Sequence, residues 1–511
     1  MKLPLLHSLF SKKTKKLTVP DTILIKKLKN LSSQSNLLIY KDVTIYHHTN
    51  SYSIPLLVID DLRGIYVFET KEWTYDELKN AQVQKAKKQE TSANTLAFDN
   101  THAIIRQKFN EITHNDGVPI FNYLLMENLN ADEYEHLNDS FKELLPKEKI
   151  IFSDSLQADI LQKLQDASPE NHTLPSREKI VTTLFMQYAI LDVHQTHIAT
   201  QEQMLFIDKE LALHEYLEGV SGSGKSNLLL LKAIKETFHN PQKKTVIVKP
   251  THLACDILKK KLLEIVEYAI IEINLSSIEI ITPLELLNRH QAKLKREPLR
   301  TVEVDDKLLH KKFFAADFIM CDDAHLLPLE FLEYIKQLQQ KRELLLVNAP
   351  KEQATLSLTK NFRMQGKSIE FCKTNPHAKA MHLIAAKIKN EQESVMLVSN
   401  SLTREKLKDD LASFIEKEPQ TIESNRPLLE QNFSQLLFCD YGDINEIQSD
   451  HIILMDLCFS SKNEIEYAFN LSTKSATVLY EEECQEIKNL RKQYEKQSSQ
   501  ERSGVESTTL A

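Results

Sequence analysis

The stretch GVSGSGKS, at residues 219–226, holds three of the eight glycines in this 511-residue chain. Glycine makes up about 7% of ordinary proteins, so each glycine here calls for a structural reason. The stretch fits the pattern G-x-x-x-x-G-K-[ST], in which glycines let backbone N–H groups curl around a phosphate. Apolar EYLEGV before it is typical of a strand, and NLLLLKAIKETF after it is typical of a helix. This context predicts a phosphate-binding loop.

The chemistry of such a loop gives each of its residues an expected role. Lys225 is expected to reach the β- and γ-phosphates, and the hydroxyl of Ser226 to bind Mg²⁺. ATP and Mg²⁺ are therefore the expected cofactors. The expected phosphate cradle consists of Gly219, Val220, Ser221, Gly222, Ser223 and Gly224.

A second, acidic motif lies about a hundred residues further along, in FFAADFIMCDDAHLL at residues 313–327. An apolar strand is expected to deliver Asp322 to its end, where the carboxylate can hold Mg²⁺ through water. Asp323 beside it can orient or deprotonate the attacking water. The alternative is an acidic turn with no function beyond being solvated. Two adjacent acids after an apolar strand favour the metal and water roles.

The composition places the chain among globular proteins. It is 41% hydrophobic and 27% charged, with a formal net charge of −8. No apolar run reaches the roughly 18 residues of a bilayer span. The start, MKLPLLHSLFSKKTKKL, has too short an apolar segment for a secretory signal, so we expect a cytoplasmic protein without membrane contact. The six cysteines have no C-x-x-C spacing, so we expect buried thiols and no zinc or disulfide framework.

Strands and helices alternate along most of the chain, which predicts an α/β protein with mostly parallel sheets. We expect a small α/β domain at 1–170, a linker and helix at 171–197, and a first lobe with both motifs at 198–360. A second lobe is expected at 361–480, and a charged helix with a disordered tail at 481–511. The oligomeric state is not indicated.

The order of motifs across residues 198–480 resembles that of superfamily 1 DNA helicases of the UvrD/Rep-like kind. The resemblance covers six further stretches. They are Thr200-Gln201-Glu202-Gln203 (the Q motif), VIVKPTHLACDIL at 246–258 (motif Ia), CDDAHLL at 321–327 (the DExx-box), LLLVNAPKEQATLSLTKNFRM at 344–364 (motifs III and IV), EIQSDHIILMD at 446–456 (motif V) and EYAFNLSTKSATVLY at 466–480 (motif VI).

This resemblance implies a P-loop NTPase with two recA-like lobes and ATP at their interface. It implies an ATP-dependent helicase or translocase whose partner is nucleic acid, with single-stranded DNA as the first expectation. Gln203 would contact the adenine, Gln353 would sense the γ-phosphate, and Arg363 would be the arginine finger. Lys474 would stand where the family has a second finger arginine.

Several positions depart from the family pattern. Asp323 replaces the usual Glu, Asn348-Ala349-Pro350 stands for Gly-Asp-Pro, and Gln448 replaces a Glu. Lys474 keeps the positive charge of arginine but loses its bidentate fork. These departures keep a second hypothesis open, namely an ATP-binding sensor or scaffold with weak or no unwinding activity.

The stretch IPLLVIDDLRGIYVFETKEW, at residues 54–73, predicts a strand, a tight turn and a strand ending in Glu69-Thr70-Lys71. It resembles the E-x-K of PD-(D/E)xK nucleases, specifically the nuclease-related (NERD-like) domain with a restriction-endonuclease-like fold. The resemblance implies that Glu69 helps to hold a metal ion and that Lys71 positions the attacking water.

The second acid of such a nuclease should lie opposite Glu69, near Ile54–Leu56, where the sequence is apolar. Asp60 and Asp61 stand at the turn, roughly 20 Å away at about 3.3 Å per residue, so they cannot share the metal of Glu69. We favour an inactive domain that binds nucleic acid. An active helicase–nuclease fusion, with an acid from another segment, and an ordinary Glu-x-Lys on a strand stay open.

Overall fold

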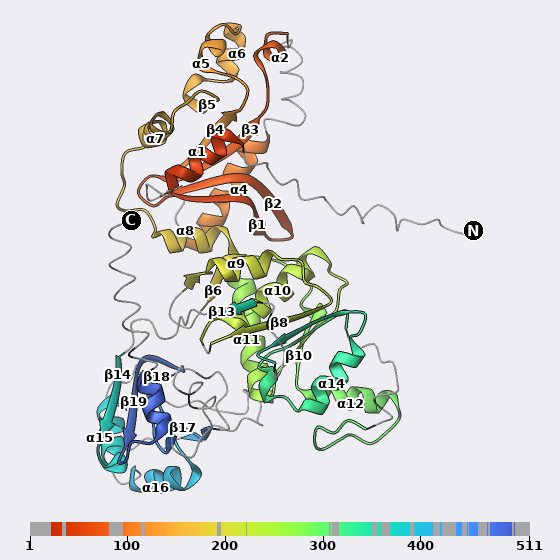
Figure 1. The fold of residues 1–511 in the computed structure, drawn as a ribbon, viewed down its shortest axis with the longest axis vertical. Coiled ribbons are helices and arrows are strands. Elements are labelled where there is room, and N and C mark those ends of the chain that lie inside the picture. The colour runs from red at the N-terminus through yellow and green to blue at the C-terminus, as the bar shows by residue number, and fades with distance from the viewer. Residues whose placement is uncertain are drawn as a thin grey trace, which may run out of the picture. The chain divides into compact units, whose positions relative to one another are not determined.

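A computed structural model gives the fold in two compact units (Figure 1). One unit consists of Met1–Met186 with Ala269–Ile271, and the other of Gln187–Tyr268 with Glu272–Ala511. The residues described are 22–32, 37–80, 96–113, 118–191, 196–220, 222–305, 308, 316–349, 354, 356–358, 368–388, 393–411, 420–421, 436–441, 447, 449–457, 465, 468, 471–492 and 495.

The first unit contains a five-stranded sheet in the order β1-β2-β3-β4-β5. The first three strands pair antiparallel, and β3, β4 and β5 pair parallel. The strands are β1 (Leu38–His47), β2 (Asn50–Asp60), β3 (Gly64–Lys71), β4 (Ile120–Met126) and β5 (Ile150–Phe152). The helices are α1 (Ile23–Ser32), α2 (Tyr75–Asn80), α4 (Leu96–Thr113), α5 (Ala131–Glu135), α6 (Asp139–Leu144), α7 (Gln157–Asp166) and α8 (Arg177–Leu184).

The core of the first unit forms where helix α1 covers the sheet. Leu24, Ile25, Leu28 and Leu31 recur at helical spacing and are buried, so they form one apolar face of α1. That face packs in one cluster with strand residues that include Phe68. Figure 1 shows α1 lying against the sheet of this unit. The strand, tight turn and strand expected at residues 54–73 are confirmed as β2, the turn at 61–63 and β3.

The second unit begins with a six-stranded, all-parallel sheet in the order β10-β9-β11-β12-β8-β13. Its strands are β8 (His214–Gly219), β9 (Thr245–Val248), β10 (Ile278–Ile281), β11 (Phe318–Cys321), β12 (Glu343–Val347) and β13 (Leu356–Leu358). Its helices are α9 (Gln201–Asp208), α10 (Lys225–His239), α11 (His252–Ala269), α12 (Pro283–Lys293) and α14 (Leu329–Leu338). A short pair, β6 (Ala189–Leu191) and β7 (Thr196–Ile198), precedes this sheet.

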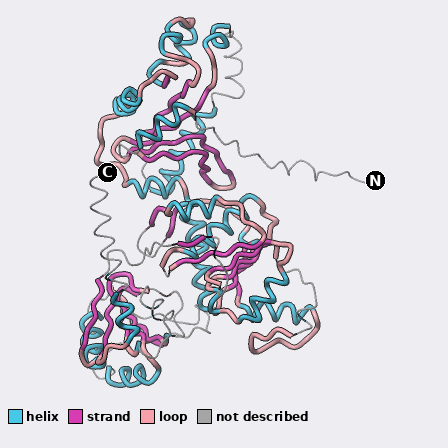
Figure 2. Tube along the Cα trace, viewed as in Figure 1, coloured by secondary structure: helices cyan, strands magenta, loops and turns pink. Residues whose placement is uncertain are grey.

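A second six-stranded parallel sheet follows, in the order β14-β19-β18-β15-β17-β16. Its strands are β14 (Ser368–Lys373), β15 (Val395–Val398), β16 (Gln420–Thr421), β17 (Leu436–Cys439), β18 (Ser449–Leu454) and β19 (Ser472–Tyr480). Helices α15 (Pro376–Ile388) and α16 (Ser401–Leu411) connect its strands. Figure 2 shows the strands of each parallel sheet side by side with helices around them.

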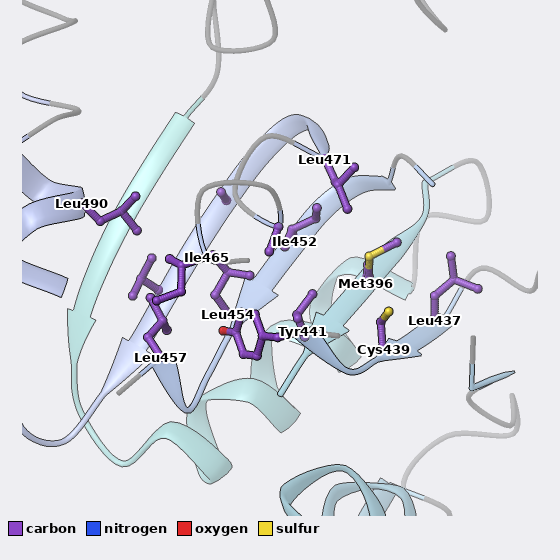
Figure 3. Packing of buried hydrophobic residues seen from close by; sticks show 14 of the residues in the cluster. Met396, Leu437, Cys439, Tyr441, Ile452, Leu454, Leu457, Ile465, Leu471 and Leu490 are labelled. Atoms are coloured by element: carbon purple, nitrogen blue, oxygen red, sulfur yellow. The ribbon is translucent and has the colours of Figure 1, made fainter. Parts of the chain in front are cut away.

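The side chains on one face of this last sheet form a fully buried core. Met396, Leu437, Ile452 and Leu454 come from three neighbouring strands and meet in one cluster (Figure 3). Strands β15 and β17 read as continuous apolar runs, as expected when helices cover both faces of a parallel sheet. The α/β fold class with mostly parallel sheets, predicted from the alternation of strands and helices, is confirmed, and so are the two parallel-sheet lobes that the family resemblance implies.

Two smaller expectations have partial outcomes. The charged segment after Tyr480 is helical at residues 485–492, and Ile487 and Leu490 are buried in the core of the last sheet. Residues 496–511, expected to be disordered, lie outside the described residues.

Four cysteines are free, as expected, but Cys484 is disulfide-bonded, which corrects the expectation of thiols alone. Disulfide pairing depends on proximity in the fold, which the spacing of cysteines along the chain does not report.

The length and polarity of the helices can be compared with those that a membrane span requires. Within the described ranges, every helix is either too short or too polar to span a bilayer.

Candidate nucleotide-binding site

The candidate site is built where four parallel strands end. Val248 of β9 pairs with Cys321 of β11, and Cys321 pairs with Leu346 of β12. Strand β12 in turn pairs with β8 at Val347 and Leu217. The residues that follow these strands are therefore neighbours at one edge of the sheet. In open parallel sheets this carboxyl edge is where ligands bind.

The glycines of the phosphate loop are explained by backbone geometry. Gly222 and Gly224 have φ values of 78° and 80°, in the left-handed region that favours glycine. A Cβ atom on Gly219 would lie 2.7 Å from Oγ of Ser223 and 3.0 Å from Cβ of Leu358. The loop therefore makes a tight turn into α10 that larger residues would block, which is the structure predicted from GVSGSGKS. Ser221 lies outside the described residues.

Lys225 opens α10, and its side chain turns back into the loop. The residue is 8% exposed, and its Nζ donates to the carbonyl oxygens of Gly219 and Val220 at 2.9 and 2.8 Å. Its ammonium is thus held inside the loop that is expected to surround phosphates. Ser226 is the next residue of the helix and is half-buried.

Asn348 holds the start of the loop in place. Its Oδ1 accepts a hydrogen bond from the backbone N–H of Gly219 at 3.1 Å, although the two residues are 129 positions apart. Asn348 follows β12 and has a φ of 53°, a conformation that asparagine tolerates better than most residues. In the sequence, Asn348 stands out only as a departure from a family pattern. Its place directly after a buried strand is the signal available for this role.

Gln203 contacts the phosphate loop and not an open pocket. The residue is 1% exposed. Its Nε2 donates to the carbonyl of Ser223 at 2.8 Å, and its Oε1 accepts from the backbone N–H of Thr200 at 2.7 Å. The second bond belongs to a capping box at the start of α9. Both ends of this amide are thus engaged within the chain, and the contact to adenine stays a prediction.

The acidic pair lies at the end of β11, as expected, and Lys249 lies between its two carboxylates. Asp322 is fully buried, and Asp323 is 9% exposed. Nζ of Lys249, itself 1% exposed, donates to Oδ2 of Asp322 at 2.9 Å and to Oδ2 of Asp323 at 2.8 Å. Lys249 could not be predicted from the sequence, because a lone lysine after a strand carries no signal of its own.

Electrostatics keep Asp323 ionised. Burial would raise the pKa of Asp323, but the charge and hydrogen bond of Lys249, with the charge of Lys225, hold it below its usual range. Burial also lowers the pKa of His325, two residues further on. The charge of Asp323 opposes this shift, and the charges of Lys225 and Lys249 add to it. Nδ1 of His325 is buried and has no hydrogen-bond partner among the residues described. The site therefore combines two carboxylates with a neutral imidazole.

Ser226 and Asp322 are the expected Mg²⁺ ligands, and the contacts of Asp322 decide whether it can accept a metal ion. Oδ1 of Asp322 accepts from the backbone N–H of Asp323 at 3.1 Å, and Oδ2 accepts from Lys249. Both carboxylate oxygens thus have donors within the chain. An ion at the usual Mg–O distance of about 2.0–2.1 Å from Asp322 would also stand close to a buried ammonium. With Lys249 in this position, the residues present do not fit Mg²⁺.

Lys474 lies at the amino end of β19, in the second parallel sheet. Its Nζ is 2.8 Å from Oε1 of Glu393 and 3.5 Å from Oδ1 of Asp450. The Lys474 hydrogen bond, followed by that of His451, lowers the pKa of Glu393 to about 2. Two carboxylates of its own lobe thus pair with Lys474, and its role as a finger residue stays a prediction. Gln353, Arg363 and Gln448 lie outside the described residues.

The Pro250-Thr251-His252 segment connects β9 to α11. Oγ1 of Thr251 accepts from the backbone N–H of Ala254 at 3.2 Å, so the threonine caps the helix. The side chain of His252 is 41% exposed. A contact of this segment with nucleic acid stays a prediction.

In the first unit, Glu69 and Lys71 form an ion pair at 2.5 Å, each about 30% exposed or less. Leu56 pairs with Phe68, so the residues of β2 that lie next to Glu69, at 54–56, are apolar. Asp60 pairs with Gly64, at the other end of β3. No second acid joins this pair within the part of the chain that the structure describes, and Asp60 lies at the far end of β3, as expected from the sequence.

Comparison with known proteins gives structural neighbours alone. No protein-family model and no curated protein matches the chain. A DEAH/RHA helicase, HrpB of Escherichia coli, is similar with 12% identity and a TM-score of 0.34, over 53% of this chain and 41% of that one. The DUF1998 helicase MrfA bound to DNA is similar with 12% identity and a TM-score of 0.41, over 60% of this chain and 49% of that one.

A third neighbour is a Dbp5 variant of S. cerevisiae bound to RNA and ADP BeF3, with 12% identity and a TM-score of 0.40. The match covers 59% of this chain and 88% of that one. At these identities and TM-scores, the likenesses carry no argument about the function of this chain. The superfamily 1 resemblance and the nuclease-related domain stay predictions. This chain has two parallel-sheet lobes and a phosphate loop, which together make the α/β fold of a P-loop NTPase.

Proposed function

We propose that this chain is a nucleic-acid-stimulated ATPase that moves along nucleic acid, with single-stranded DNA as its first expected partner. One observation carries the proposal. A complete phosphate loop, its lysine and an acidic pair meet at the carboxyl edge of a parallel sheet, and a second parallel-sheet lobe follows in the same chain. The order of motifs in the sequence adds movement on nucleic acid to nucleotide binding.

In this proposal the loop backbone and Lys225 bind the phosphates. The two carbonyls that now accept from Lys225 leave its ammonium within reach of an incoming phosphate, which would replace them as the acceptor. The ionised Asp323 is the group in the site that can orient an attacking water. Arg363 would supply positive charge from the second lobe. The Mg²⁺ expected from the sequence has no part in these steps.

A second candidate function is a nucleotide sensor or scaffold that binds ATP with little turnover. The contacts of Lys249 favour it, because both carboxylates that hydrolysis would use are engaged by one buried ammonium. The local pairing of Lys474 with Glu393 favours it too. Nucleotide binding alone needs only the phosphate loop and Lys225, and the sensor and the translocase would both use them.

For the first unit we propose a nucleic-acid-binding role without cleavage. The apolar stretch opposite Glu69 and the ion pair between Glu69 and Lys71 support it, because a two-acid metal site lacks its second acid there. A divalent-metal nuclease assay tests this proposal. Cleavage by the full chain that is lost in Lys71→Ala would contradict it and favour the helicase–nuclease fusion.

The central experiment is ATP turnover of the full chain with and without single-stranded DNA, and with RNA of the same sequence. The translocase proposal expects stimulation by nucleic acid and its loss in Lys225→Ala. Lys232→Met serves as the matched control, because Lys232 is a buried lysine of the same helix that bonds to Ile207 and Lys209 carbonyls. Folded protein that binds ATP without turnover would favour the sensor.

A further inference from the structure

Lys249 is buried in the acidic pair in the place where a metal ion is expected. It follows β9 directly, and its side chain is 1% exposed. One ammonium bridges the two carboxylates, with Nζ–Oδ2 distances of 2.9 Å to Asp322 and 2.8 Å to Asp323. The residue supplies a full positive charge between the two acids of the pocket.

The sheet fixes this arrangement. The backbone N–H of Lys249 donates to the carbonyl of Ile281 at 3.1 Å, and the N–H of Asp322 donates to the carbonyl of Val248 at 3.0 Å. Because β9 and β11 pair in parallel register, Lys249 and Asp322 are held side by side at the same edge. The lysine is therefore positioned by backbone pairing on both sides and not by its side chain alone.

Moving the ammonium away would be costly. A buried charge is stable when it is paired and hydrogen-bonded, and breaking such a pair leaves both partners uncompensated. A divalent ion bound to Asp322 would add two positive charges beside Lys249, with Lys225 also close enough to act on Asp323. Repulsion among these cations opposes metal binding unless Lys249 leaves its pair.

We propose that Lys249 is a built-in cation of the nucleotide pocket, which takes the position and the charge-neutralising role of a divalent metal ion. The pocket then binds a nucleoside triphosphate without requiring Mg²⁺. This inference rests on the proposed nucleotide binding and adds the metal-free form of the nucleotide as its ligand. An ammonium can serve as a point charge toward phosphate oxygens as well as toward carboxylates.

The first test measures the affinity of the full chain for a fluorescent, non-hydrolysable ATP analogue in buffer with Mg²⁺ and in buffer with EDTA. We expect the two dissociation constants to agree within about threefold. Binding that is weaker by about tenfold or more in EDTA, a difference of ~1.4 kcal/mol, would overturn the inference alone. Absence of binding in both buffers would overturn the proposed nucleotide function as well.

The second test converts the site. Lys249→Met keeps the length of the side chain and removes its charge, so nucleotide binding should become dependent on Mg²⁺ by about tenfold. Mn²⁺ bound to the nucleotide-free protein, measured by electron paramagnetic resonance, should rise in Lys249→Met. Wild type should hold no more Mn²⁺ than Asp322→Asn. A wild-type site that is lost in Asp322→Asn would contradict the inference.

Two further variants keep the test decisive if Lys249→Met does not fold. Lys249→Met with Asp323→Asn leaves one uncompensated carboxylate instead of two and should still gain Mn²⁺ binding. Lys232→Met removes a buried lysine of the same lobe from outside the pocket, where its ammonium bonds to backbone carbonyls. That control should leave the metal dependence of nucleotide binding unchanged, and a change there would overturn the specific role of Lys249.

Discussion

Replacing Gln203 tests whether this residue orders the phosphate loop, as its hydrogen bonds in the structure indicate, or contacts the adenine, as the family resemblance implies. Its amide makes two hydrogen bonds through its side chain, to the Ser223 carbonyl and to the Thr200 N–H. Each is worth about 1 kcal/mol net, so Gln203→Ala should lower the free energy of unfolding by ~2 kcal/mol. The bond to Ser223 also orders the phosphate loop. In Gln203→Ala, part of the free energy of nucleotide binding must be spent on ordering the loop.

Loss of that ordering predicts weaker binding by about fivefold, equal to ~1 kcal/mol. Because the loop contacts phosphates and not the base, the loss should be the same for ATP, GTP and tripolyphosphate. Gln203→Glu should be worse than Gln203→Ala, since it places a carboxylate oxygen against the buried Ser223 carbonyl. Isothermal titration with the three ligands, beside urea unfolding, measures both effects.

Gln201→Ala is the matched control, because Gln201 lies in the same helical turn and is exposed. It should change neither affinity nor stability. The reasoning is refuted if Gln203→Ala weakens ATP alone and leaves GTP and tripolyphosphate unchanged. That result would assign Gln203 to the adenine, as the family resemblance implies.

Three further predictions follow from single contacts. Gly64→Ala should destabilise the first unit by about 3 kcal/mol, because Gly64 has a φ of 132° and a Cβ would lie 2.3 Å from the Pro119 carbonyl oxygen; the fluorescence of Trp73, the one tryptophan of the chain, reports its unfolding. Asn348→Ala should weaken nucleotide binding by about fivefold through the lost bond to Gly219, while Asn348→Asp, which keeps the acceptor, should not. Burial lowers the pKa of His290 to about 4, so the unfolded state binds its proton first as pH falls. The stability that His290 contributes, measured by urea unfolding as the difference between wild type and His290→Gln, should then fall between pH 6.5 and about 4.

The sequence alone determined the local parts of the site. Glycines at 219, 222 and 224 mark a turn that needs left-handed backbone and close approach, so the phosphate loop could be read from eight residues. The apolar run before Asp322 predicted its strand, and the alternation of strands and helices predicted mostly parallel sheets. Each of these signals is local, because backbone conformation and side-chain periodicity act over a few residues.

Only the tertiary structure decided which residues these motifs meet. Lys249 and Asp322 are 73 residues apart, and Asn348 and Gly219 are 129 apart. Strand order brings them together, because the sheet places β9 beside β11 and β12 beside β8 although neither pair is consecutive in the chain. A lysine after one strand and two acids after another carry no sign of pairing until that order is known. Their ion pair, which decides whether the pocket has room for a metal ion, is therefore a property of the sheet and not of any one motif.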